Sequence, residues 1–186
     1  QWTRLLESNS EYGSVNGYAL TTGTDGSIYI AGSTTGDLGG ETSNGIGLDA
    51  FISKYNPDGT QNWSKLLGTF YEEEALALTT GLDGSIYIAG YTTGNLDDQS
   101  TKIDNASWGD NASAFISKYN IDGEKQWTRL LESHSEYASV SGFALTTGSS
   151  GSIYIAGSTT GELDGQKGTS YEENAFISKY NVDGEK

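Results

Sequence analysis

The chain has 186 residues, a formal net charge of −15 and 34% hydrophobic residues. Charge of this sign disfavours nucleic-acid phosphates and anionic membrane surfaces as partners, since both attract Lys/Arg-rich patches. The sequence contains no long apolar span, so membrane insertion is not predicted. With no Cys, the chain can form neither a disulfide framework nor a thiolate metal site. Twelve Tyr, five Phe and four Trp still supply large apolar groups, so we expect a folded chain.

The first predicted elements are four short extended segments, each rich in aromatic or β-branched residues and bounded by Gly, Asn or Asp. They are Val15–Thr22, Ser27–Thr34, Ala50–Asn56 and Gln61–Leu67. Asp25-Gly26 lies between the first two segments and Asp58-Gly59 between the last two. Because Asp-Gly supplies the positive φ of tight hairpins, these segments are predicted to form one antiparallel four-stranded sheet.

This unit is written three times along the chain. The segment SIYIAGST at 27–34 returns as SIYIAGYT at 85–92 and as SIYIAGST at 152–159. The segment FISKYN begins at Phe51, Phe115 and Phe176 in the same order. Residues 1–186 are therefore interpreted as a single repeat region, with repeats at about 1–60, 61–125 and 126–186.

The fold class predicted from these repeats is all-β, with the sheets arranged as β-propeller blades. No residue of Ile28–Ala31 is charged although successive side chains point to opposite faces, so each sheet needs a neighbour on both sides. Four-stranded antiparallel repeats stacked in this way are typical of propellers. A stacked β-solenoid is the alternative, but its repeats are usually shorter.

The two ends of the chain lie in repeat register. Reading from Asp183–Lys186 into Gln1–Leu6 reproduces the internal sequence Asp122–Leu131. The third repeat thus lacks its outer strand, and the first residues supply one that is available for ring closure, with Trp2, Arg4 and Leu6 as interaction residues. Since a propeller needs at least about four blades, we expect either a strand-exchanged homodimer with six blades or a longer array.

A known family resembles this pattern. Asp25–Thr34, Asp49–Tyr55 and Trp63 are similar to the bacterial SBBP (seven-bladed β-propeller) repeat of large cyanobacterial surface or secreted proteins. The resemblance implies propeller blades in an extracellular or cell-surface setting, and it brings no catalytic residues. The expected function is therefore a non-enzymatic structural or adhesive scaffold that self-associates.

Acidic loops offer a possible cation site. Hard cations such as calcium take clustered carboxylates, Asn side chains and backbone carbonyls, which gather in two loops that follow SIYIAG segments. The candidate ligands are Asp97, Asp98, Asp104, Asp110, Glu162 and Asp164. No EF-hand spacing is present, and solubility alone also explains loop carboxylates.

Two other functions are open at this stage. Trp108 lies outside the repeating frame, between Asn and Asp residues, and could stack on a sugar or anchor its loop. It is the candidate ligand residue of a glycan-binding propeller, with a glycan or a surface protein as partner. Paired carboxylates could also serve a propeller glycoside hydrolase.

Overall fold

The computed structural model describes residues 1–44, 46–97, 99, 111–135, 138–168 and 172–186. All regular elements in these ranges are strands: β1 (Val15–Thr22), β2 (Ile28–Thr34), β3 (Asp49–Tyr55), β4 (Gln61–Leu67), β5 (Glu73–Thr80), β6 (Ile86–Thr92), β7 (Ser113–Tyr119), β8 (Lys125–Leu131), β9 (Val140–Thr147), β10 (Ile153–Thr159) and β11 (Asn174–Tyr180). The all-β class is confirmed. Within the described residues no helix has the length and apolar character needed to cross a bilayer.

The strands form three antiparallel sheets, one for each repeat. The first has the order β1-β2-β3-β4, the second β5-β6-β7-β8, and the third β9-β10-β11. Two of the four strands predicted in the first repeat, Val15–Thr22 and Gln61–Leu67, have the predicted bounds. The second strand begins one residue later than predicted, and the third is shifted by one residue at both ends. Among the described residues the third sheet has three strands, and no outer strand pairs with β11.

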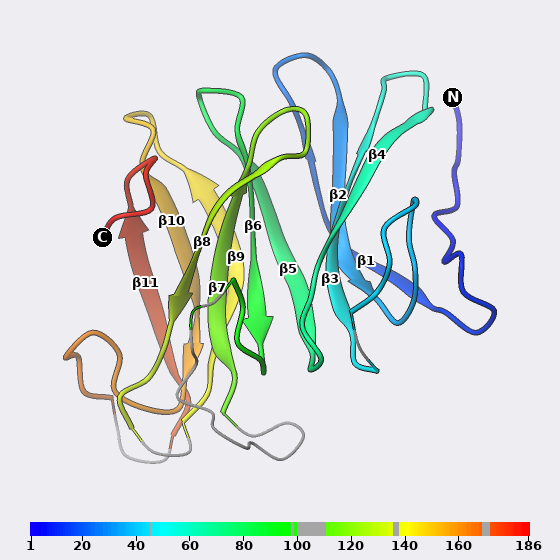
Figure 1. Cartoon of the computed structure of the whole chain (residues 1–186). Helices are drawn as coiled ribbons and strands as arrows, with labels where there is room; N and C mark the ends of the chain where they lie inside the picture. Colours follow the sequence, from blue (N-terminus) through cyan, green and yellow to red (C-terminus); the bar gives the residue numbers. More distant parts are fainter. Residues whose placement is uncertain (45, 98, 100–110, 136–137, 169–171) are drawn as a thin grey trace.

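Tight hairpins join the first strand to the second and the third to the fourth in the complete sheets. Gly26 and Gly59 adopt φ values of 79° and 81°, as the Asp-Gly turns predict. Asp25 fixes its turn by accepting hydrogen bonds from the backbone and hydroxyl of Ser27, at 3.0 and 2.8 Å. The hairpins lie at one end of the sheets and the longer connections at the other (Figure 1).

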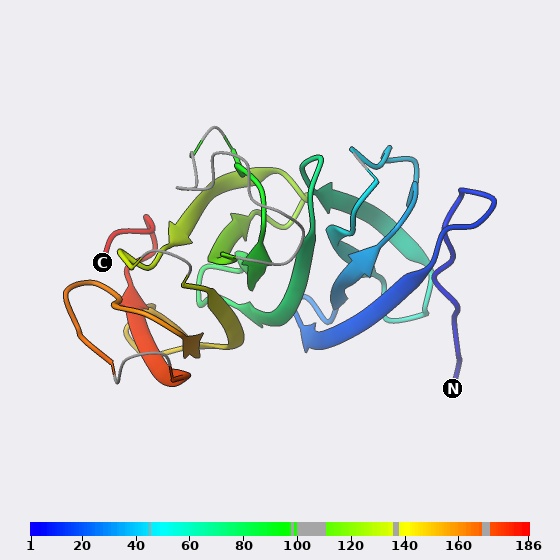
Figure 2. The same cartoon turned by 90° about the horizontal axis from the view of Figure 1, so that it is seen from below.

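The three sheets lie side by side in a row, and apolar cores fill the two seams between them (Figure 2). Tyr29, Ile52 and Leu78 belong to the core between the first and second sheets. Ile116 and Ile155 belong to the core between the second and third sheets. The row is open, so the closed propeller ring remains a proposal.

Each terminal sheet has one uncovered face. Ile52 of β3 and Ile116 of β7 are fully buried, whereas Ile177, at the same position of β11, is 73% exposed. On the inner strands, Leu78 of β5 is 9% exposed but Leu20 of β1 is 69% exposed. The sequence alternation is the same in the three sheets, so the difference arises from the lack of a neighbouring sheet.

Candidate functional site

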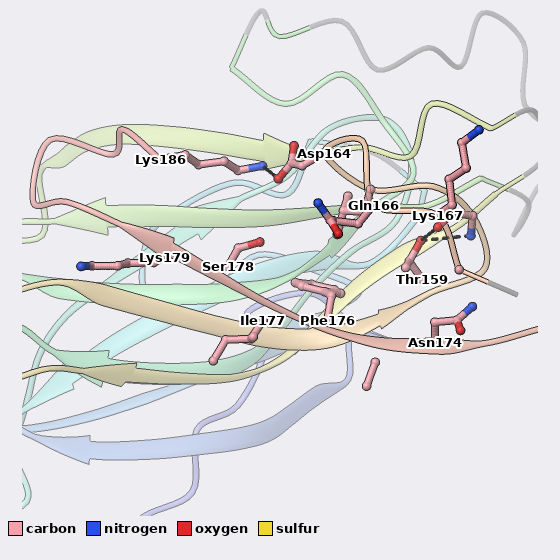
Figure 3. Close-up of a pocket in the computed structure, with 14 residues that line it drawn as sticks. Thr159, Asp164, Gln166, Lys167, Asn174, Phe176, Ile177, Ser178, Lys179 and Lys186 are labelled. Carbon is pink, nitrogen blue, oxygen red and sulfur yellow. Dashed lines mark hydrogen bonds and ion pairs between the residues drawn. The ribbon is translucent and has the colours of Figure 1, made fainter.

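The candidate site is the open edge of β11, where the outer strand of the third sheet would lie. Each of the other two sheets carries an outer strand at this position, β4 on β3 and β8 on β7. Next to β11 a groove of about 560 Å³ takes its place. Its lining includes Leu163, Asp164 and Gln166 from the β10–β11 connection and Phe176 and Ser178 from β11 (Figure 3).

The second sheet shows how an outer strand is held at this edge. Thr128 of β8 shares a hydrogen bond of 2.8 Å with the hydroxyl of Ser117 on β7. Asp97, from the connection after β6, accepts hydrogen bonds from the Thr128 hydroxyl and the Lys125 ammonium group. The side-chain amide of Gln99 donates to the backbone carbonyl of Thr128 at 2.8 Å.

The third sheet holds the same set of groups around the empty position. Ser178 corresponds to Ser117, Asp164 to Asp97, and Gln166 to Gln99. Lys186 forms an ion pair with Asp164, as Lys125 does with Asp97 (Figure 3). Among the described residues, what the third sheet lacks is an outer strand with a threonine that corresponds to Thr128 of β8.

The segment Gln1–Leu6 carries that sequence and lies at the other end of the molecule. It forms no strand, and it runs along the outside of the first sheet (Figure 1). It is docked instead on the first sheet, where Trp2 Nε1 donates to the Pro57 carbonyl at 3.1 Å and Arg4 Nε donates to the Gly59 carbonyl at 3.0 Å.

These contacts reproduce those of an outer strand with the following sheet. Trp127 Nε1 of β8 donates to the Val182 carbonyl at 3.2 Å, and Arg129 Nε donates to the Gly184 carbonyl at 2.9 Å. The Arg129 guanidinium group also lies over the Trp127 ring, 5.4 Å from its centre. The corresponding distance between Arg4 and Trp2 is 5.8 Å, so Gln1–Leu6 has the pose of an outer strand without its own sheet.

A lysine on the third strand of each sheet points to the next sheet. Lys54 Nζ lies 3.3 Å from Asp25 and donates to the Ile121 carbonyl at 3.2 Å. The hydrogen bond from the Ser27 backbone lowers the pKa of Asp25, and Lys54 lowers it further. In β7, Lys118 similarly bonds to Asp83 and, at 3.1 Å, to the Val182 carbonyl.

Lys179 of β11 is the third member of this series. It lies over the Tyr154 ring, 6.0 Å from its centre, in the way that Lys54 lies over Tyr29. In the described part of the chain, no further sheet lies beside the third sheet to offer Lys179 such a carbonyl. In the alignment of the repeats, Pro57 corresponds to Ile121 and Val182, whose carbonyls accept from Lys54 and Lys118. The Pro57 carbonyl already accepts a hydrogen bond from Trp2.

The predicted calcium ligands do not form one cluster in the described residues. Asp97 and Asp164 pair with lysines, and the backbone of Glu162 accepts from the hydroxyl of Ser133 at 2.8 Å. Among the described residues no group of three His, Cys, Asp or Glu side chains is placed to hold a metal. Asp98, Asp104 and Asp110 lie outside the described residues, so calcium binding stays a prediction.

Trp108, the candidate glycan-stacking residue, also lies outside the described part of the chain. Trp2 and Arg4 take part in the docking described above, and Leu6 lies beside them against the first sheet. The sequence reasoning overlooked Asp164 and Gln166 as contacts for a strand. A signal was available, because the segments 38–41, 96–99 and 163–166 align in the repeats.

Comparisons with known proteins give distant similarities. No family model matches the chain. It is 29% identical over 171 residues to the regulatory protein FlaEY of Caulobacter vibrioides, a match that covers 88% of this chain and 18% of that protein's length. Among solved structures, a catalytically inactive virginiamycin B lyase from Staphylococcus aureus with quinupristin is similar at a TM-score of 0.34 and 16% identity, over 96% of this chain and 58% of that one.

Proposed function

We propose that this chain is a non-enzymatic scaffold module of propeller-type blades that self-assembles by strand exchange. In this proposal, Gln1–Leu6 of one copy adds to the open edge of β11 in a second copy. The observation that supports it most is the pose of Gln1–Leu6, which makes outer-strand contacts on one side and has no sheet on the other.

The β7–β8 pair gives the register of the added strand. There Ser117 is opposite Thr128, Phe115 is opposite Leu130 and Lys118 is opposite Trp127. Transferred to β11, this register places the second copy's Thr3 opposite Ser178, its Leu5 opposite Phe176 and its Trp2 opposite Lys179. Backbone pairing of this kind removes an exposed edge that would otherwise favour uncontrolled aggregation.

The same register brings the uncovered faces of the two copies together. The exposed side chain of Ile177 would meet the apolar face of the first sheet, which includes Leu20. Lys179 would reach the second copy's Pro57 carbonyl, as Lys118 reaches that of Val182. Two such contacts close a ring of six blades with two-fold symmetry.

The resemblance of Asp25–Thr34 to SBBP repeats supports an extracellular or cell-surface role, structural or adhesive, for this assembly. The proposal includes calcium bound at the acidic loops that contain Asp97 and Glu162. Bound calcium would lessen the electrostatic repulsion between two copies that each carry a net charge of −15.

The test is the molar mass of the purified chain by light scattering, with calcium and with a chelator. We expect twice the chain mass of 19.8 kDa, and a mass of one chain after deletion of residues 1–6. Circular dichroism of the deletion variant checks that its sheets remain. Equal masses for the two proteins would contradict strand exchange, and an unchanged mass with chelator would remove calcium from the assembly.

A further inference from the structure

A short turn before the third strand contacts the outer strand in each complete sheet. We call it the clasp, and define it by two side-chain positions. These positions are Gly39 and Glu41 in the first repeat, Asp97 and Gln99 in the second, and Asp164 and Gln166 in the third. In every repeat an isolated antiparallel bridge closes the turn, between residues 38 and 41, 96 and 99, or 163 and 166.

The clasp of the first sheet fits a strand that carries Ser64 and Lys65. Lys65 Nζ forms an ion pair with Glu41 at 2.6 Å. The Ser64 hydroxyl accepts from the side-chain amide of Gln61 at 2.6 Å. A Cβ atom on Gly39 would lie 2.7 Å from the Cβ of Ser64, so this clasp leaves no room for a side chain at its first position.

The clasp of the second sheet fits a strand that carries Thr128 and Arg129. Asp97 accepts from the Thr128 hydroxyl, and Gln99 donates to the Thr128 carbonyl. Arg129 donates to the Gly184 carbonyl of the next sheet at 2.9 Å, and its guanidinium group also donates to the Thr128 carbonyl at 2.9 Å. Between the first two sheets, therefore, both the clasp residues and the outer-strand residues that they contact are different.

Backbone geometry at the first clasp position strengthens this correspondence. Gly39 has a φ of 59°, and Asp97 and Asp164 occupy the same left-handed region with φ values of 55° and 50°. Side chains other than glycine rarely adopt this conformation, and an aspartate there costs some stability relative to glycine. Two of the three clasps nevertheless carry the carboxylate, which indicates a role for its contacts.

We infer that the clasp selects the outer strand, and that Asp164 and Gln166 select the Thr3-Arg4 strand of a second copy over the Ser64-Lys65 type. This inference rests on the proposed strand exchange and names its specificity. Asp164 would accept from the Thr3 hydroxyl beside its own Lys186, and Gln166 would donate to the Thr3 carbonyl. If the strand carried a lysine in place of Arg4, that lysine would face Gln166. The amide of Gln166 cannot form the ion pair that the Glu41 carboxylate forms with Lys65.

The experiment compares two dye-labelled peptides of equal charge, QWTRLL (residues 1–6) and NWSKLL (residues 62–67). Fluorescence anisotropy measures their binding to the chain that lacks residues 1–6, in which no second copy can occupy the edge of β11. We expect QWTRLL to bind up to about fivefold more tightly, because the lysine of NWSKLL would find no carboxylate at Gln166 and an exposed ion pair is worth up to about 1 kcal/mol. In the variant Asp164→Gly with Gln166→Glu, which installs the clasp of the first sheet, we expect the preference to reverse. Glycine suits the positive φ, so the variant should fold.

The outcomes separate the selection from the strand exchange. Equal binding of the two peptides, or an unchanged preference in the variant, would overturn selection by the clasp and leave strand addition standing. Failure of both peptides to bind this shortened chain would contradict strand addition itself. As a matched control, Asp122→Asn removes an exposed carboxylate in the β7–β8 turn and should leave the preference unchanged.

Discussion

Two carboxyl groups are buried at the seam between the first and second sheets. Asp49 and Glu73 have no solvent exposure. Glu73 accepts hydrogen bonds from Thr69 and Thr92, whereas Asp49 Oδ1 has no hydrogen-bond partner among the described residues. Burial raises the pKa of both groups, and the charge of Asp49 raises the pKa of Glu73 further.

These shifts predict a seam that is more stable in acid. A group whose folded pKa is raised contributes its full stability below the ordinary value, 3.8 for Asp49, and loses it as the pH rises through the folded value. Asp49→Asn, which installs the residue found at position 174, should therefore have a melting temperature similar to the native one near pH 4 and a higher one near pH 8.

Thermal unfolding at several pH values checks this prediction. The net charge of −15 also makes the whole protein more stable in acid, so the informative quantity is the difference between native and variant melting temperatures. Asp122→Asn, on the surface, serves as the charge-matched control and should show a nearly constant difference. A constant difference for Asp49→Asn as well would contradict the destabilising charge at the seam.

At the level of elements, equivalent strands differ according to what covers them. β3, β7 and β11 all contain the sequence AFISKY, yet β3 is buried throughout and β11 alternates between half-buried and exposed positions. Ile177 is 73% exposed, whereas its counterparts Ile52 and Ile116 are fully buried. The uncovered face of β11 is thus the surface that a neighbouring sheet would cover in the proposed assembly.

Substitution of Ile177 should weaken assembly without disturbing the single chain. Burying an isoleucine side chain is worth roughly 1.5–3 kcal/mol, so Ile177→Lys should raise the dissociation constant by about 10- to 100-fold. Sedimentation velocity over a range of concentrations measures it. Leu82→Lys, in the β5–β6 turn at a residue that is 67% exposed, is the matched control and should assemble as the native chain does. Unchanged assembly of Ile177→Lys would place the contact elsewhere.

The elements were predictable where the repeat and its turns carry the information. Alternation and Asp-Gly turns predict the strands of each sheet, because both signals are local. Gln1–Leu6 has the sequence of a strand but is not one, since a strand needs a neighbouring edge that the single chain does not provide. The clasp was missed because its contacts depend on the left-handed backbone at Asp97 and Asp164, which sequence spacing does not reveal.

For the whole molecule, the arrangement of the sheets decides what strand addition produces. The N-terminal segment and β11 lie at opposite ends of the row, so the first strand of one chain is not beside its own vacant edge (Figures 1 and 2). In the proposed assembly, the contact between copies would therefore be head-to-tail. Such contacts give closed rings if the rotation between copies closes, and growing filaments if it does not. A mass that stops at two chains would therefore identify the ring.

Ionic strength should strengthen this assembly. Each copy carries a net charge of −15, whereas the ion pair of Lys186 with Asp164 lies within one chain and is not formed on association. Repulsion between copies acts over about 30 Å at 0.01 M salt and about 10 Å at 0.1 M, so screening lowers the cost of association while the apolar contact at Ile177 remains. We expect the dissociation constant, measured by sedimentation, to fall several-fold between these salt concentrations. A rise would mean that attraction between opposite charges of the two copies dominates the contact, contrary to the apolar seam proposed above.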